Sequence, residues 1–150
     1  MPQSLAKLYV HLVFSTKNRQ SILDDDLRDD LHDYLGGILR DLNCQAIEIN
    51  SEPDHVHMLF LLSRTTTISD VVANVKRGSS LWLKTHGAAY AEFHWQAGYG
   101  VFSVSQSAVE EVRAYVRNQR EHHRTMSFQE EFRAFLQRHE IVFDESYVWD

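Results

Sequence analysis

The 150-residue sequence has a single cysteine, Cys44, which excludes an intramolecular disulfide and any zinc site built from several thiolates. It also lacks an N-terminal basic segment followed by a long apolar run, so we expect no signal peptide. No apolar stretch is long enough to cross a bilayer. We therefore expect one cytoplasmic domain without a membrane partner, large enough to bury its own core.

Positive charge is also scarce, with 15 lysines and arginines against 21 aspartates and glutamates. The net charge of −6 argues against a protein that coats nucleic acid along its length. The basic side chains are grouped, however, and a small basic site on an acidic body fits a short, defined nucleic-acid ligand. The alternative is that these side chains lie on solvated loops and helix ends without a ligand. The candidate contacts are Lys17, Arg19, Lys76, Arg77, Arg117, Arg120, His122 and His123.

The spacing of apolar residues divides the chain into short strands and amphipathic helices. It predicts strands over residues 8–14, 44–49, 55–62 and 101–105, and helices over 27–42 and 68–85. The order β-α-β-β-α-β predicts an α+β fold with a ferredoxin-like, RRM-like antiparallel sheet over residues 5–106. Two more helices are expected, each opened by a Ser-x-x-Glu capping box: one over 108–123 and one beginning the C-terminal segment 127–150.

The third predicted strand carries two histidines that can act together. It follows Pro53, and strand alternation places His55 and His57 on one face, with the apolar residues between and after them on the other. Such a pair can supply two nitrogen ligands to one metal ion, although a purely structural pair is the alternative. Asp54 could orient His55 or simply cap the turn, and His11 on the first strand could support the site or be structural.

The predicted 108–123 helix carries Tyr115 and Gln119, which lie one turn apart on one face. The alternative is a surface tyrosine that packs on a glutamine. Together with the two histidines, Gln119 would make a three-ligand site with open positions, which suits Mg²⁺ or Mn²⁺ better than structural zinc. The metal would act as a Lewis acid, and Tyr115 could attack phosphorus once its phenolate is favoured. We expect His57 and Gln119 at exposed edges.

These motifs resemble the single-tyrosine HUH transposases of the simplest bacterial insertion sequences, the IS200-like transposase family. The resemblance is carried by residues 13–19, 52–59, 98–103 and 115–123. It implies a DNA transposase: an endonuclease and strand transferase that acts on single-stranded DNA near hairpins at the ends of the element. By this resemblance Tyr115 is the nucleophile that forms a 5′-phosphotyrosine, and His55, His57 and Gln119 hold the metal.

The resemblance also implies a homodimer in which the tyrosine helix of one subunit can complete the site of the other. No nucleotide cofactor is expected, because the phosphotyrosine bond conserves the energy of the phosphodiester. A sheet covered on one face only would leave a surface for a second subunit. In the competing arrangement, the C-terminal helix and the Trp149 tail cover that surface in a monomer. The C-terminal helix and tail fall outside the motifs, and the sequence assigns them no role beyond packing.

Two other functions compete with transposition. One is a domesticated relative that binds hairpin DNA without a role in transposition. The other is a metal-dependent phosphodiesterase that uses water and in which Tyr115 is structural. The intact Tyr115 and Gln119 argue against the loss of chemistry.

Overall fold

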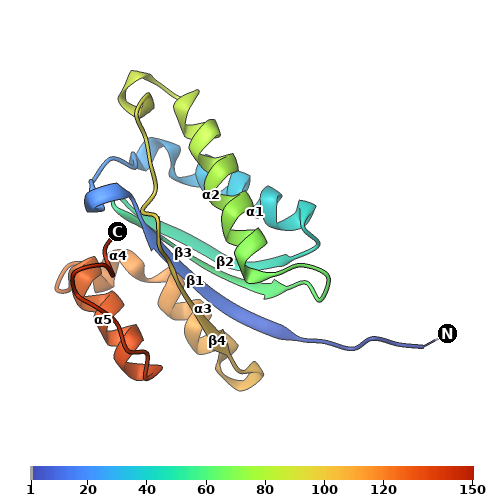
Figure 1. Ribbon diagram of the computed structural model, residues 1–150. Coiled ribbons are helices and arrows are strands. Elements are labelled where there is room, and N and C mark those ends of the chain that lie inside the picture. Colours follow the sequence, from blue (N-terminus) through green and yellow to red (C-terminus); the bar gives the residue numbers. More distant parts are fainter. Residues whose placement is uncertain (1) are drawn as a thin grey trace.

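The computed structural model describes residues 2–150, and within them lies a four-stranded antiparallel sheet with the strand order β2-β3-β1-β4 (Figure 1). The strands are β1 (Leu8–Ser15), β2 (Gln45–Glu52), β3 (His55–Leu62) and β4 (Gly100–Val104). Helix α1 (Arg28–Asp41) follows β1, and α2 (Ile68–Lys84) follows β3. The chain order β-α-β-β-α-β and the antiparallel sheet confirm the predicted ferredoxin-like fold.

Strand β2 is longer than predicted, because polar residues continue it to Glu52 and leave only Pro53 and Asp54 for the turn. The prediction ended this strand at residue 49 because the apolar pattern stops there, and that end was wrong. Asn50 and Ser51 are nevertheless buried, and each side chain has a hydrogen-bond partner. A buried polar group is tolerated when it is paired in this way.

Helices α1 and α2 cover one face of the sheet. Val56, Met58 and Phe60 of β3 point toward them, and the alternate residues Val10, Leu12 and Phe14 of β1 do the same. Each of these side chains is buried in the largest of the three apolar clusters. Burial of one such side chain contributes about 1.5–3 kcal/mol to stability. This face follows directly from strand alternation in the sequence.

The chain's own C-terminal helices cover the other face: α3 (Val109–Arg117), α4 (Gln119–His122) and α5 (Phe128–Arg138) (Figure 1). The apolar side of α5 packs on Val13 of β1 and Phe102 of β4. Gly100 permits this close approach, because a β-carbon there would collide with the ring of Phe132. Of the two predicted coverings, the structure therefore shows the one supplied by the same chain, and the dimer stays a prediction.

The predicted continuous helix over 108–123 is wrong, because α3 and α4 are separated at Asn118 (φ −94°, ψ 27°). The cause lies in β2: Asn50 Nδ2 donates hydrogen bonds of 2.9 Å to the carbonyl oxygens of Val116 and Arg117. An inserted side chain that takes helix carbonyls is a recognised cause of a kink.

The two predicted capping boxes have different outcomes. The box at Ser107 is wrong, because a short 3-10 turn precedes α3 and the N-cap residue is Ala108. At Ser127 the N-cap is confirmed: its hydroxyl accepts a hydrogen bond from the backbone N–H of Glu130 at 3.2 Å. The Glu130 carboxylate contacts the Ser127 hydroxyl. Among residues 2–150, none of the helices is both long and apolar enough to cross a bilayer.

Candidate active site

The two histidines of β3 lie on a rigid support, because β3 pairs with β2 on one side and with β1 on the other. Both side chains point toward α3, α4 and α5, opposite to the face that α1 and α2 cover. His55, His57 and Gln119 each have an exposed fraction of 0%. The expectation that His57 and Gln119 lie at exposed edges is therefore wrong, because helices cover this face as well.

The Nδ1 atom of each β3 histidine contacts one of the residues that were predicted to support the site. Asp54 Oδ1 lies 2.6 Å from His55 Nδ1, and His11 Nε2 lies 2.8 Å from His57 Nδ1. Burial, followed by the neighbouring His57, lowers the pKa of His11 well below its ordinary value, so His11 is neutral. Both contacts fix the Nδ1 side of a ring and leave Nε2 directed into the site.

Gln119 and Tyr115 reach the same place from the two sides of the helix break. Gln119 Oε1 lies 3.3 Å from His55 Nε2, and the Gln119 amide donates to the carbonyl oxygen of Tyr115 at 3.3 Å. The ring of Tyr115 lies 6.1 Å from the ring of His57 and stacks on His122 at 4.3 Å. The structure thus brings together all four residues of the two sequence motifs.

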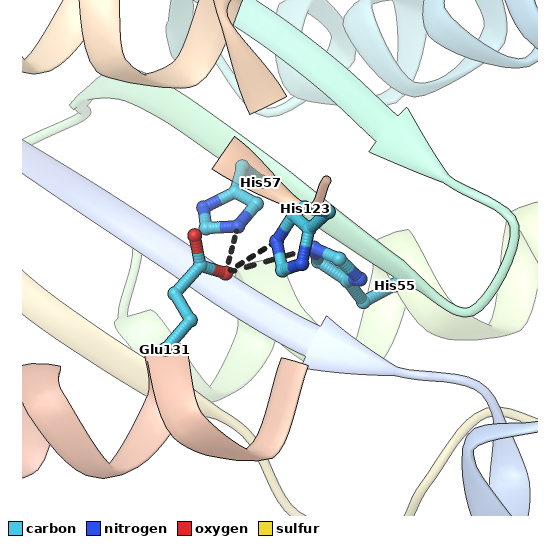
Figure 2. Close-up of side chains that lie close together, drawn as sticks. All are labelled: His55, His57, His123 and Glu131. Carbon is cyan, nitrogen blue, oxygen red and sulfur yellow. Dashed lines mark hydrogen bonds and ion pairs between the residues drawn. The ribbon is translucent and has the colours of Figure 1, made fainter. Parts of the chain in front are cut away.

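Two further residues complete a cluster around the histidines of β3 (Figure 2). His123 was predicted as a nucleic-acid contact or a solvated helix end, and Glu131 was not predicted to have a role. Glu131 reaches up from α5, and its Oε1 lies 2.8 Å from His57 Nε2, 3.2 Å from His123 Nε2 and 3.6 Å from His55 Nε2. The Tyr115 hydroxyl donates to the other carboxylate oxygen, Oε2. His123 therefore lies inside the cluster, and not at a solvated helix end.

One feature of the sequence distinguishes Glu131 from the other acidic residues. It lies on the apolar side of α5, beside Phe128, Phe132 and Phe135, where an acid has no reason to be buried unless it has partners. An acid inside an apolar stripe could therefore have marked α5 as part of a site.

The charges of the cluster depend on one another. Burial acts to raise the pKa of Glu131, but His57, His123 and His55 outweigh burial and hold it well below its usual range. The carboxylate is therefore ionised and can only accept hydrogen bonds, so His57 Nε2 carries the proton toward it.

The ionised Glu131 acts in turn on Tyr115 and His123. Burial and the charge of Glu131 raise the pKa of the Tyr115 hydroxyl well above its ordinary value, so the phenol keeps its proton. Burial acts to lower the pKa of His123, but the hydrogen bond and charge of Glu131 outweigh burial and raise it. The imidazole nitrogens of His57 and His123 and the Tyr115 hydroxyl therefore donate to the Glu131 carboxylate, which accepts these hydrogen bonds.

The donor set fits a divalent metal ion. His55, His57, His123 and Glu131 each offer one ligand atom, and these atoms lie within 4.8 Å of one another. The amide oxygen of Gln119 lies 3.1 Å from His123 Nε2 at the same place. Ligands with metal bonds of about 2.1 Å lie about 3 Å apart around one ion, which is close to these separations. Imidazole and carboxylate donors without thiolate suit several divalent ions, including Mn²⁺.

A cavity of about 840 Å³ opens beside Tyr115, between β4, α3 and α5. Its wall includes Phe102, His122, Phe135 and Arg138, together with the Tyr115 ring. Tyr115 therefore lies between the buried cluster on one side and an open cavity on the other.

Several candidate nucleic-acid contacts have partners within the chain. Lys76 Nζ donates to the carbonyl oxygens of Gln96 and Gly98 at 2.8 and 2.6 Å. Arg117 forms an ion pair with Glu48 at 3.0 Å, and Arg120 pairs with Asp25 at 2.8 Å. These three side chains would have to exchange a partner in order to bind phosphate.

The remaining candidates are placed differently. Lys17 and Arg77 are exposed. The guanidinium of Arg19 lies 5.6 Å from the centroid of the Trp149 ring, and His122 stacks on Tyr115. A role of any of these residues in nucleic-acid binding stays a prediction.

Comparisons with known proteins show the family of the chain. Residues 4–119 match a family model described as "Transposase IS200 like". The ISDra2 transposase TnpA of Deinococcus radiodurans is 26% identical over 121 residues, which cover 75% of this chain and 84% of the relative. The matched range of the family model ends at Gln119, so His123 and Glu131 lie beyond it.

Two solved structures are similar to the chain. A crystal structure of a candidate transposase from Deinococcus radiodurans R1 has a TM-score of 0.62 and 26% identity, covering 79% of this chain and 98% of that one. A REP-associated tyrosine transposase bound to a REP hairpin has a TM-score of 0.61, covering 82% of this chain and 73% of that one. Its identity is 14%, so this second likeness concerns the fold.

Proposed function

The chain belongs to the IS200-like transposase family, and we propose that it cleaves and rejoins single-stranded DNA with Tyr115 as its nucleophile. Its relatives support an enzymatic role as a transposase. The observation that carries the finer proposal is the convergence of Tyr115, Gln119 and the two β3 histidines within one chain. A nucleophile beside a set of metal ligands suits phosphoryl transfer to a side chain.

In the proposed cleavage, Tyr115 Oη forms a bond to the scissile phosphorus and the bond from phosphorus to the 3′ oxygen breaks. The products are a 5′-phosphotyrosine and a free 3′-hydroxyl, so the proton lost by the phenol equals the one gained by the 3′ oxygen. The reverse reaction rejoins strands without a nucleotide cofactor, because the covalent bond conserves the energy of the phosphodiester. A divalent cation, Mg²⁺ or Mn²⁺, held by His55, His57 and Gln119 would polarise the phosphate as a Lewis acid.

The chain's own residues prepare this step. Asp54 and His11 orient the two imidazoles, and the stacked ring of His122 restricts the orientation of Tyr115. The adjacent cavity of about 840 Å³ offers room for the nucleotide next to the scissile bond. Aromatic and cationic walls such as those of Phe135 and Arg138 suit an unpaired base and its phosphate.

We propose hairpin-containing single-stranded DNA as the ligand. The REP-associated neighbour is bound to a hairpin, and this chain shares its fold. A homodimer is proposed on the family resemblance. Light scattering decides the stoichiometry, and a monomeric mass at micromolar concentration would refute the dimer.

The function is tested by incubating the protein with single-stranded hairpin DNA in the presence and absence of Mn²⁺ or Mg²⁺. A metal-dependent protein–DNA adduct that survives denaturation is the expected result. Binding without cleavage would instead support the domesticated hairpin-binding protein. Cleavage without an adduct would support a phosphodiesterase that uses water. A competitor duplex of the same sequence serves as the control for single-strand specificity.

A further inference from the structure

We propose that Glu131 is itself a ligand of the metal ion, so that helix α5 contributes to the metal centre. This inference rests on the metal-assisted function proposed above and adds a ligand that lies outside the matched family range. It changes the expected donor set from two imidazoles and a neutral amide to one that includes an anion.

The first argument is the position of Glu131 Oε1. This single oxygen lies within 3.6 Å of three Nε2 atoms, those of His55, His57 and His123. An ordinary structural ion pair needs one partner for each oxygen. Convergence of three imidazole nitrogens and one carboxylate oxygen at one point is instead the arrangement of a metal centre.

The second argument is burial. Glu131 has an exposed fraction of 1%, although the carboxylate comes from a helix whose neighbouring side chains are phenylalanines. An ionised carboxylate in such surroundings is costly unless it is fully paired or coordinates a metal. Glu130, the preceding residue on α5, is exposed and contacts the Ser127 hydroxyl, so the two neighbouring acids differ in kind.

The third argument is the support behind the histidines. Asp54 and His11 contact the Nδ1 atoms of His55 and His57 and thereby direct the Nε2 atoms toward Glu131. Backing contacts of this kind are typical of histidines that ligate metals. Because Oε2 accepts the Tyr115 hydrogen bond, ligation through Oε1 would also hold the nucleophile at a fixed place beside the metal.

The inference is tested by measuring Mn²⁺ binding, from the electron paramagnetic resonance signal of the free ion, with the full-length protein and no DNA. We expect Glu131→Gln, which keeps the shape and removes the charge, to weaken Mn²⁺ binding at least about tenfold. Glu130→Gln is the matched control on the same helix and should leave the affinity unchanged. Hydrogen exchange gives a second readout: Mn²⁺ should protect the amides of α5 in the wild-type protein.

Each outcome bears on one proposal. Wild-type affinity in Glu131→Gln would overturn the inference, and tighter binding would do so by showing that the carboxylate competes with the metal. If Glu131→Gln fails to fold, hydrogen exchange of the wild-type protein decides. Binding of Mn²⁺ without protection of the α5 amides would then overturn the inference. Weak binding in His57→Ala with unchanged binding in Glu131→Gln leaves the proposed function standing. A wild-type protein that binds no Mn²⁺ would instead refute the metal-assisted function.

Discussion

The two faces of strand β3 belong to the same eight residues, yet they meet different surroundings. Toward α1 and α2, Val56, Met58 and Phe60 enter an apolar cluster that needs only volume and shape. Toward α3, α4 and α5, His55 and His57 enter a cluster of hydrogen bonds around a buried carboxylate. The first face supplies stability, while the second contains polar groups that are expensive to bury.

Mutations on the two faces of β3 should therefore have different effects. On the apolar face, a smaller side chain should lower the free energy of unfolding and leave the chemistry of the folded molecules unchanged. On the polar face, a small change should remove activity from a protein that still folds. Four substitutions can break or sharpen this separation.

The largest effect is expected from Tyr115→Phe, which removes the proposed nucleophile and keeps the ring that stacks on His122. Adduct formation and cleavage should fall by at least about 10⁴-fold, or about 5.5 kcal/mol of transition-state stabilisation. Hairpin binding should be retained. Denaturing gels measure the adduct, and Tyr147→Phe in the exposed tail is the control. An adduct in the Tyr115→Phe variant would contradict the assignment.

The second largest effect is expected from Phe60→Ala on the apolar face. It should lower the free energy of unfolding by about 3–5 kcal/mol, because it leaves a cavity under α1 and α2. Urea denaturation measures this loss, and Leu81→Ala, an exposed position on α2, should change it little. Lost cleavage in a Phe60→Ala sample that is still folded would show that the two faces are coupled.

The third prediction concerns Gln119→Ala. Metal-dependent cleavage should fall about 10²-fold, or about 2.7 kcal/mol, because an amide oxygen beside His55 and His123 is lost. Cleavage as a function of Mn²⁺ concentration measures the effect, with Gln137→Ala on the exposed side of α5 as the control. Unchanged metal dependence would remove Gln119 from the proposed ligand set.

The smallest effect is expected from Gly100→Ala, where a β-carbon would collide with Phe132 and push α5 away from the sheet. The free energy of unfolding should fall by about 1–3 kcal/mol, as measured in urea. Gly37→Ala is the control, since a β-carbon there meets no atom within 4 Å, and it should be neutral or stabilising. A Gly100→Ala variant as stable as the wild type would mean that α5 can repack on the sheet.

The sequence predicted the sheet well because its signals are local. Strand β3 has the predicted limits, 55–62, since strict alternation follows directly after Pro53 and Asp54. The break at Asn118 could not be predicted in this way, because its cause is Asn50, which is 66 residues from Val116 along the chain. Hydrogen bonds between distant segments leave no periodic pattern in either of them.

The residues of the candidate site also differ in whether a local sequence pattern identifies them. His55, His57, Tyr115 and Gln119 belong to short motifs, and the structure brings them together as expected, while their roles stay predictions. Glu131 belongs to no motif, and only its place within the apolar stripe of α5 distinguishes it from the acid before it. Its partners lie on β3 and beyond α4, so the fold is needed to find it.

The alternation of β3 has a consequence for how this chain can change its length. A single residue inserted or deleted between His55 and His57 would exchange the two faces of every strand residue beyond it. It would carry an imidazole into the apolar cluster and a methionine or phenylalanine against Glu131. An insertion or deletion at this place would therefore lower the stability of the fold and disrupt the candidate site at the same time. Substitutions can alter one face at a time, and changes of length cannot.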